Sequence, residues 1–258
     1  MLILKRCKYN KFYKMNKAHI LQTEGNNIEK IVHMSDIKIC DSNKEKLKNA
    51  FQKLYAEIEE LTKTSRIMIC ICGNLSGSDE YSGSIIELYG NFLQQLCNYA
   101  PVLMVPGERD FDPYDKYEEN YIVATTLMRN RELKNNFYLL VNNGIYKYNN
   151  LSFGITHAFS EEVTECAETT DGEKKVSMYS GLIYLENNVT ETCRFNMDDF
   201  KDYDLCLFGG TKNSFLLTND SSRWYSGSFI DHTEDTHIGK YILWNITTNK
   251  GESRCFSY

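Results

Sequence analysis

Residues 67–74 read Ile-Met-Ile-Cys-Ile-Cys-Gly-Asn, an uninterrupted apolar run that stops at a glycine and an amide. A short apolar run of this kind is typical of a strand that is buried on both faces. Helical patterns lie on both sides of it, because apolar residues recur at spacings of three and four over residues 47–61 and over residues 85–99. This alternation predicts an α/β domain in which helices cover a sheet core.

The rest of the chain supplies further strands. The apolar runs Ile31–Met34 and Val102–Val105 predict two of them in the first half. The second half is richer in sheet, with strand candidates at residues 137–141, 144–148, 151–155, 176–179, 203–208, 224–230 and 240–246. No repeat or linker interrupts the pattern, so we expect one domain with a two-sheet core over residues 28–258, preceded by a basic segment over residues 1–27.

Composition limits the class of protein. The chain has 258 residues, of which 42% are hydrophobic and 25% charged, values that exclude a disordered or collagen-like chain. Nine cysteines without a CxxC pair favour a reducing compartment, so an intracellular, cytoplasmic protein is expected. No stretch approaches the roughly 20 apolar residues of a membrane span, and none is predicted.

Charge is unevenly distributed along the chain. The formal net charge is −6, but residues 1–23 carry six basic side chains and no acidic one. This basic leader is compatible with contact to nucleic acid or to an anionic membrane, but a solvated terminal segment is the favoured interpretation. The acidic remainder argues against a broad groove that tracks nucleic-acid phosphates.

Small and polar residues follow several predicted strands at their carboxyl ends. In layered α/β folds, ligands bind where such strand ends and their loops converge. The segments concerned are Met34–Lys38, Cys72–Asn74, Pro106–Asp110, Met178–Gly181 and Phe208–Lys212. The chemistry of the protein is therefore expected at this edge of the sheets.

These segments resemble, in the same order, the motifs of the calcineurin-like metallophosphoesterases. The family pattern runs SD-x-H, GD, GNHD, a strand-end His and GH-x-H, where this chain reads SDIK, GN, GERD, YSG and GGTK. The likeness covers about residues 30–248 and is closest in style to the SbcD-like nuclease branch, including its versions in large DNA viruses. It implies a four-layer α/β/β/α sandwich, with two mixed sheets flanked by helices, and descent from a metal-dependent phosphodiesterase or nuclease.

The same resemblance implies that nearly all of the family's metal ligands are replaced here. Family members clamp a phosphate with two divalent cations, which carboxylates and neutral imidazoles hold. Asp36 matches a ligand of the first metal, and Asp110 matches the residue that orients the catalytic imidazole. Asn74 stands where the family has the bridging carboxylate, and Glu108 where it has an asparagine. The family's histidines are replaced at five positions, which are Lys38, Arg109, Ser180, Gly210 and Lys212.

The charges of this vestigial site balance, because it holds three cationic and three anionic side chains. The cluster can therefore neutralise itself without metal. We expect Lys38 and Lys212 to flank Asp36 in a network of ion pairs, since a buried charge requires a partner. No catalytic residue, metal or cofactor is predicted on this interpretation.

Two other occupants of the site stay open. Asp36, Asn74 and Glu108 offer oxygen ligands to a single Mg²⁺ or Mn²⁺. Alternatively, the three cationic side chains hold a phosphate or nucleotide that is not hydrolysed.

The histidines have competing interpretations. His33 lies inside a predicted strand and is expected to be a core residue. His157 also follows a strand, but Ser180 matches the family's strand-end position better. His232 and His237 lie among acidic residues of a predicted loop, where solvent exposure is expected and an adventitious metal is the alternative.

Taken together, the sequence favours a pseudoenzyme that is retained as a binding or scaffolding module for an unknown protein partner. The alternative is a divergent phosphoesterase or nuclease that uses one metal or none, and a third interpretation is nucleic-acid binding through residues 1–23. SbcD-like nucleases are expected to work with an SMC-like ATPase through regions after the core. This chain ends at Tyr258, so that partnership is not expected.

Overall fold

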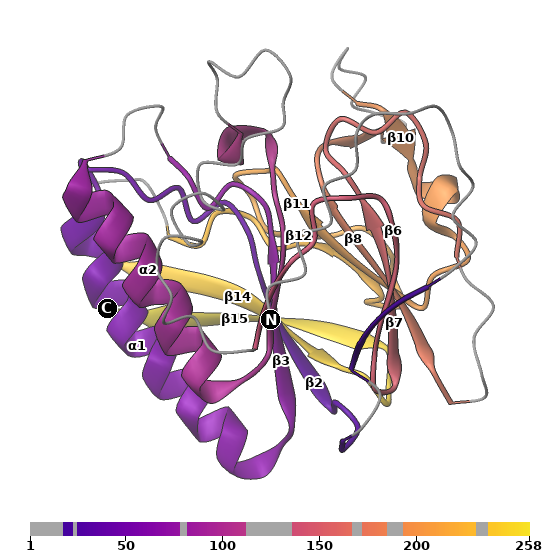
Figure 1. Cartoon of the computed structure of the whole chain (residues 1–258), viewed down its shortest axis with the longest axis horizontal. Coiled ribbons are helices and arrows are strands. Elements are labelled where there is room, and N and C mark those ends of the chain that lie inside the picture. The colour runs from indigo at the N-terminus through magenta and orange to yellow at the C-terminus, as the bar shows by residue number, and fades with distance from the viewer. Residues whose placement is uncertain are drawn as a thin grey trace.

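Two mixed β-sheets pack against each other, and two α-helices cover the outer face of the first (Figure 1). The computed structural model describes residues 18–22, 25–77, 82–111, 136–166, 172–184, 193–230 and 237–258. The predicted α/β architecture, with two mixed sheets and flanking helices, is confirmed.

The first sheet has six strands in the order β15-β14-β2-β3-β4-β5. Their bounds are Lys30–Met34 (β2), Ile67–Cys72 (β3), Val102–Val105 (β4), Phe137–Leu139 (β5), Ile238–Asn245 (β14) and Lys250–Ser257 (β15). Strands β2 to β5 run parallel, whereas β14 and β15 are antiparallel to their neighbours. The carboxyl ends of β2, β3 and β4 therefore lie at one edge.

Strand β3 is buried on both faces, as its apolar sequence predicts. Ile69 and Ile71 belong to the hydrophobic cluster under the helices, whereas Cys70 and Cys72 belong to the cluster between the two sheets. Successive side chains of a strand point to opposite faces, so only an uninterrupted apolar run can serve both clusters.

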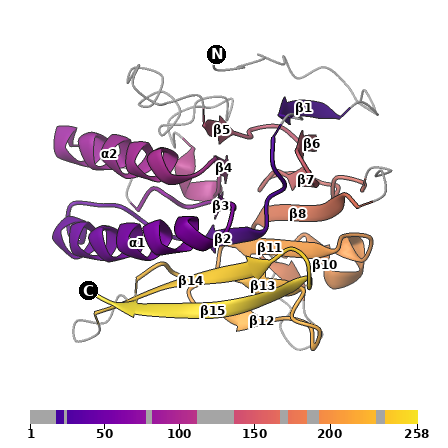
Figure 2. The ribbon, with the colours of Figure 1, turned by 90° about the horizontal axis from the view of Figure 1, so that it is seen from below.

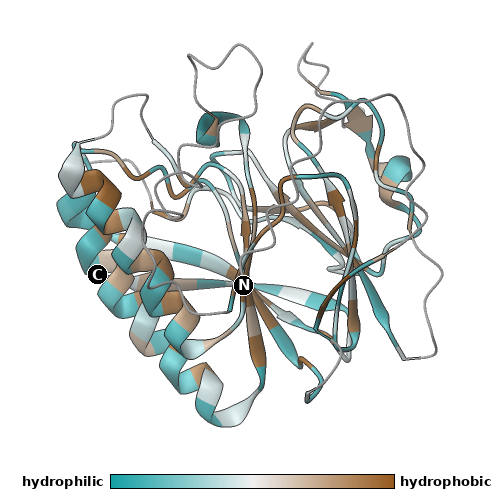
Figure 3. Ribbon diagram, viewed as in Figure 1, coloured by the Kyte–Doolittle hydropathy of each residue, from teal (hydrophilic) through white to brown (hydrophobic). Residues whose placement is uncertain are grey.

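The two helices, α1 (Lys44–Thr64) and α2 (Gly83–Tyr99), lie side by side on the first sheet (Figure 2). The rings of Phe51 and Phe92 stack between them with their centres 4.0 Å apart. In Figure 3 both helices alternate hydrophobic and hydrophilic residues along their length, as expected for helices with one buried side. No helix in the described ranges is long and apolar enough to cross a membrane.

The second sheet has seven strands in the order β1-β6-β7-β8-β11-β13-β12. Their bounds are His19–Gln22 (β1), Gly144–Tyr148 (β6), Leu151–Thr156 (β7), Lys174–Ser180 (β8), Leu205–Gly209 (β11), Phe215–Leu216 (β12) and Arg223–Tyr225 (β13). Strands β7, β8, β11 and β13 are parallel, so their carboxyl ends also share an edge.

The outer face of the second sheet is covered differently from that of the first. Its cover within the described residues is a short 3-10 helix, η2 (Met197–Phe200), and the strand pair β9 (Ile183–Tyr184) and β10 (Phe195–Asn196). Phe200 of η2 packs against Phe208 of β11, with ring centres 5.0 Å apart. Among the described residues, aromatic side chains thus cover this face.

The structure differs from the strand predictions at several points, including the short strands β9, β10 and β12, which were not predicted. Strands β1 and β15 lack the apolar patterns that mark a strand, and both are edge strands, where polar side chains meet solvent. The candidate at 224–230 is a strand only to Tyr225, because the chain then turns at Gly227, with φ +73°, and bridges to Ser35 of the first sheet through Ser228. The division into segments 1–27 and 28–258 stays a prediction, and β1 lies before that boundary.

The basic leader lies largely outside the described residues. All six of its basic side chains fall within residues 1–17, which the structure does not describe. Contact with nucleic acid through this segment therefore stays a prediction.

Candidate functional site

The carboxyl ends of strands from both sheets meet at one edge, and glycines make the close approach possible. A Cβ atom on Gly209 would lie 1.9 Å from the carbonyl oxygen of Cys72. A Cβ on Gly73 would lie 2.0 Å from Oγ of Ser180, and Gly73 also has φ +76°. Both distances are far below van der Waals contact, so the two sheets can meet here only without side chains at these positions.

The turns that follow β2 and β3 have unusual backbone conformations. Asp36, Lys38 and Asn74 all adopt left-handed conformations, with φ of 50°, 54° and 56°. Asp and Asn tolerate this region, whereas a lysine in it carries strain of about 1 kcal/mol or more. The Lys38 amide donates to the carbonyl of Asn74 at 3.0 Å, which ties the two turns together.

Both carboxylate oxygens of Asp36 are fully engaged. Nζ of Lys38 lies 3.2 Å from Oδ1, and Nδ2 of Asn74 donates to the same oxygen at 3.0 Å. Oδ2 accepts from Oγ of Ser35 at 2.9 Å and from the Gly210 amide at 2.7 Å. With the Asp36 side chain only 1% exposed, these four donors replace water around the buried charge.

Asn74 presents its amide group in one orientation. An ionised carboxylate only accepts hydrogen bonds, so the side chain must turn its nitrogen to Asp36. Its oxygen, Oδ1, then accepts from the backbone amide of Arg109 at 3.2 Å. The oxygen that could ligate a cation therefore faces away from Asp36.

Asp110 joins the turns that follow β3 and β4. Its Oδ2 accepts from the backbone amides of Asn74 and Gly107, both at 2.8 Å, and its Oδ1 accepts from the Ser76 amide at 2.9 Å. The side chain is fully buried, and burial raises its pKa to about 6 against the opposing effect of the three amide donors; the nearby Asp36 charge also raises it. Asp110 is thus a buried cross-link between backbone segments.

The expected network of ion pairs is half correct. Lys38 lies against Asp36 as predicted. Placing Lys212 there was wrong, because its side chain is exposed and forms no ion pair within the described part of the chain. The chain turns at Gly210, with φ +101°, so that a backbone amide rather than the second ammonium reaches Asp36.

Two further predicted site residues, Glu108 and Arg109, are exposed on η1 (Glu108–Asp110), the 3-10 helix after β4. Ser180 ends β8 and pairs in register with Gly209 of β11. Its Oγ is buried and has no hydrogen-bond partner among the described residues. The match of Ser180 to the family's strand-end histidine stays a prediction.

The histidines lie apart from the Asp36 network. His33 is fully buried, which lowers its pKa to about 3, and its prediction as a core residue is confirmed. His157 follows β7, where burial and, to a smaller degree, the charge of Arg194 lower its pKa to about 4. His237 is exposed and packs edge-on against Tyr258, whereas His232 lies outside the described residues.

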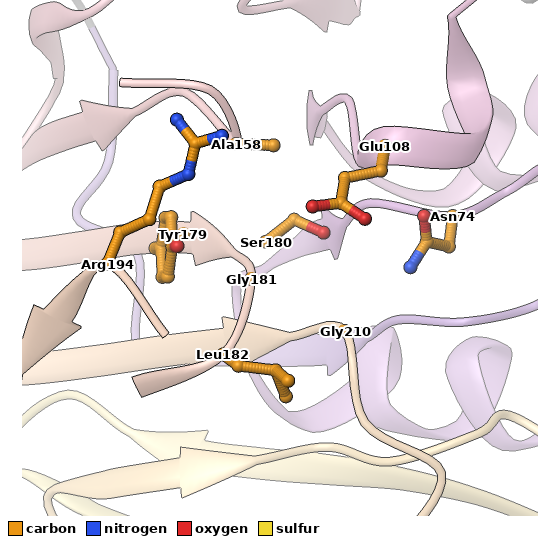
Figure 4. Close-up of a pocket in the computed structure, with 9 residues that line it drawn as sticks. All are labelled: Asn74, Glu108, Ala158, Tyr179, Ser180, Gly181, Leu182, Arg194 and Gly210. Carbon is orange, nitrogen blue, oxygen red and sulfur yellow. The ribbon is translucent and has the colours of Figure 1, made fainter. Parts of the chain in front are cut away.

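A cavity of about 150 Å³ lies next to the Asp36 network (Figure 4). Its lining consists of Asn74, Glu108, Ala158, Tyr179, Ser180, Gly181, Leu182, Arg194 and Gly210. Four of the predicted site residues are among them, whereas Lys38, Arg109 and Lys212 are not. Arg194 was missed by sequence reasoning, since it lies just before β10 in a stretch without a motif.

Comparison with known proteins identifies the family. The model of the calcineurin-like phosphoesterases matches residues 29–253. The chain belongs to this family. Among its relatives is protein R555 of Acanthamoeba polyphaga mimivirus, 23% identical over an alignment of 245 residues that covers 87% of this chain but only 18% of R555. The crystal structure of TT1561 from Thermus thermophilus matches with a TM-score of 0.53 at 13% identity, covering 88% of this chain and 99% of that one, and this likeness shows the shared fold.

The calcineurin-like phosphoesterase family implies a pair of divalent cations, and the side chains at this edge do not fit one. No group of three or more His, Cys, Asp or Glu side chains that could hold a metal occurs in the described ranges. Asp36 is the carboxylate that best matches a metal ligand of the family, and it forms an ion pair with the Lys38 ammonium group. An ammonium group repels a metal cation and cannot ligate it.

Proposed function

We propose that this chain is a metal-independent, non-catalytic member of the calcineurin-like phosphoesterase family, whose strand-end site binds rather than hydrolyses. The proposal rests on one observation, the contact of 3.2 Å between Nζ of Lys38 and Oδ1 of Asp36. The lysine acts as a tethered cation at a carboxylate that would otherwise attract a divalent ion. A tethered charge supplies neutralisation but no metal-bound hydroxide.

The residues at two further catalytic positions of the family are also unsuited to hydrolysis. Hydrolysis of a phosphate ester by this family's route requires an acid that protonates the leaving group. The corresponding position holds Arg109, and a guanidinium is too weak an acid to serve as the proton donor for a leaving group. The orienting position, Asp110, accepts hydrogen bonds from three backbone amides instead of orienting an imidazole. These features support loss of catalysis together with retention of the folded site.

The test is a Mn²⁺ titration by calorimetry, combined with an assay of hydrolysis of a generic aryl phosphodiester in excess Mn²⁺. We expect no saturable Mn²⁺ binding below about 1 mM and no hydrolysis above that of an Asp36→Ala variant. Tight Mn²⁺ binding with turnover that Asp36→Ala abolishes would instead establish the alternative, a divergent phosphoesterase that uses a metal.

We further propose a place for the chain within the family and a role for its basic leader. Placement near the SbcD-like branch is supported by the order of the motifs, and a large-DNA-virus lineage by the mimivirus relative. Binding of nucleic acid by residues 1–23 predicts affinity that falls steeply with salt and disappears when the leader is removed. Measurement of DNA binding at about 50 and 200 mM salt, with and without those residues, tests this part separately.

A further inference from the structure

Two opposite charges line the cavity without pairing with each other. Glu108 comes from η1 and Arg194 from the segment before β10, and Figure 4 shows them on either side of Ser180. Neither side chain forms an ion pair with any residue that the structure describes. Among the described residues, Arg194 makes a long contact of 3.5 Å to the carbonyl of Ser160 and lies 5.7 Å from the ring centre of Phe159. Its other donors have no partner in that part of the chain.

A buried hydroxyl lies between these two charges. Oγ of Ser180 belongs to a side chain that is 1% exposed, lines the cavity and has no hydrogen-bond partner in the described structure. Buried polar atoms are nearly always paired, so an unpaired one beside a cavity points to a group that arrives from outside. The phenol of Tyr179 has its pKa raised to about 12, chiefly by burial, while Glu108 raises and Arg194 lowers it, so both charges act on the same small volume.

The neighbouring polar groups are not free to bind a ligand in the same way. The Gly210 amide is used by Asp36, and both ends of the Asn74 side-chain amide are used by Asp36 and the Arg109 backbone. The side-chain groups left in the cavity are one carboxylate, one guanidinium and the hydroxyls of Tyr179 and Ser180. A simple anion would be repelled by Glu108, and a simple cation by Arg194.

We propose that this cavity binds a small zwitterion, with its ammonium group at Glu108 and its carboxylate at Arg194. A guanidinium group can donate two parallel hydrogen bonds to one carboxylate, as Arg194 would to the ligand. The Ser180 hydroxyl lies between Glu108 and Arg194. A volume of about 150 Å³ is below the 300–1,000 Å³ of pockets for drug-sized ligands, so the ligand has the size of an amino acid. This inference deepens the proposed binding role of the same site and rests on it.

The test uses the full chain in EDTA and a series of amino acids with increasing spacers: glycine, β-alanine, 4-aminobutyrate and 6-aminohexanoate. Acetate, ethylammonium and inorganic phosphate are titrated alongside by calorimetry. We expect one spacer length to bind at millimolar concentration and at least about tenfold more tightly than acetate or ethylammonium alone, because each end makes a charge-assisted hydrogen bond.

Variants of Glu108 and Arg194 then test which side chain binds each charged group of the ligand. Glu108→Gln and Arg194→Gln should each weaken the preferred amino acid about tenfold, whereas the matched changes Glu87→Gln on α2 and Arg254→Gln on β15 should leave its affinity unchanged. Absence of binding for every spacer length, a preference for phosphate, or equal affinity in both cavity variants and the wild type would overturn the inference. Because EDTA is present throughout, hydrolysis with Mn²⁺ in the separate assay would contradict the proposed function without changing this result.

Discussion

The Asp36 network and the adjoining cavity share the Asn74 side chain and Gly210, yet they differ in how their polar groups are used. Around Asp36, two oxygens accept from four donors, including the Lys38 ammonium. In the cavity, Glu108 and Arg194 form no ion pair with described residues and a buried hydroxyl has no partner among them. The protein itself therefore satisfies the polar groups around Asp36, whereas the polar groups of the cavity are left to solvent or to the ligand that we propose.

This difference separates stability from binding. Substitutions in the Asp36 network and at Asp110 should lower the free energy of unfolding, because they leave buried donors or charges unpaired. Substitutions of Glu108 or Arg194 in the cavity should change ligand affinity and leave the free energy of unfolding nearly unchanged. The following variants test that division in order of decreasing effect.

The largest loss of stability is expected for Asp110→Ala. The change leaves three buried backbone amides, those of Asn74, Ser76 and Gly107, without an acceptor. At about 1 kcal/mol or more for each, unfolding should become easier by about 3 kcal/mol in urea titrations. Asp198→Ala, an exposed carboxylate on η2, is the control and should change stability by less than about 0.5 kcal/mol.

Asp110 should also leave a signature in the pH dependence of stability. Its pKa is raised from 3.8 to about 6 in the folded protein, so between these values the folded state holds a proton that the unfolded state has released. The contribution of Asp110 to stability should therefore decrease as the pH rises from about 4 to about 6. The difference in unfolding free energy between the wild type and Asp110→Ala should shrink over that range, and a constant difference would contradict the raised pKa.

Next in size is Lys38→Met, which should lower stability by about 2 kcal/mol. It leaves the Asp36 charge with neutral donors only, and loss of one partner from a buried pair usually costs somewhat more than this. Adding Asp36→Asn in the same chain should recover only part of the loss in thermal unfolding, because it removes the unpaired charge but turns an NH2 group toward donors that Asp36 now accepts from. Millimolar Mn²⁺ should raise the melting temperature of Lys38→Met but not that of the wild type, since the variant offers Asp36 to an external cation.

Lys212→Met is the matched control for this experiment, because its exposed ammonium makes no ion pair in the described structure. Its unfolding free energy should stay within about 0.5 kcal/mol of the wild type. Equal losses of stability for the two lysine variants would instead support the sequence prediction that both Lys38 and Lys212 pair with Asp36.

Gly73→Ala tests the close approach of the two sheets. The added Cβ would meet Oγ of Ser180 at 2.0 Å, and the residue would keep a positive φ. Gly172→Ala has a similar φ, +86°, but nothing within 4 Å of its added Cβ, so it isolates the backbone strain. We expect a loss of about 1 kcal/mol for Gly172→Ala and about 1 kcal/mol more for Gly73→Ala in denaturant titrations.

The smallest effects come from two buried serines. Oγ of Ser35 donates to Asp36 and accepts from Ser226, whereas Oγ of Ser180 has no described partner. Ser35→Ala should therefore cost about 1 kcal/mol, and Ser180→Ala should be neutral within about 0.5 kcal/mol. Calorimetric melting of both variants measures the difference, and a larger loss at Ser180 would mean that its hydroxyl is already paired.

The sequence predicted the elements whose residues repeat at a helical spacing or form unbroken apolar runs. Helices α1 and α2 and strands β2, β3 and β4 are such elements, and the structure confirms them. Strand β15, Lys250–Ser257, was missed because most of its side chains are polar and exposed, so burial imposes no pattern on its sequence.

The site was predictable where the backbone alone determines position. The carboxyl ends of parallel strands fix Asp36, Asn74 and Ser180 at one edge, and those residues lie together. Lys212 was misplaced because its direction depends on the turn at Gly210, which spacing does not reveal. Arg194 could not be predicted, since it reaches the cavity from the covering layer rather than from a strand end.

A crystal grown in excess Mn²⁺ and measured with anomalous scattering tests the central claim most directly. We expect no manganese peak at Asp36, and the Lys38 ammonium within hydrogen-bonding distance of Oδ1, near the present 3.2 Å. Two manganese ions about 3.5–4 Å apart, with the lysine side chain displaced from Asp36, would contradict the account.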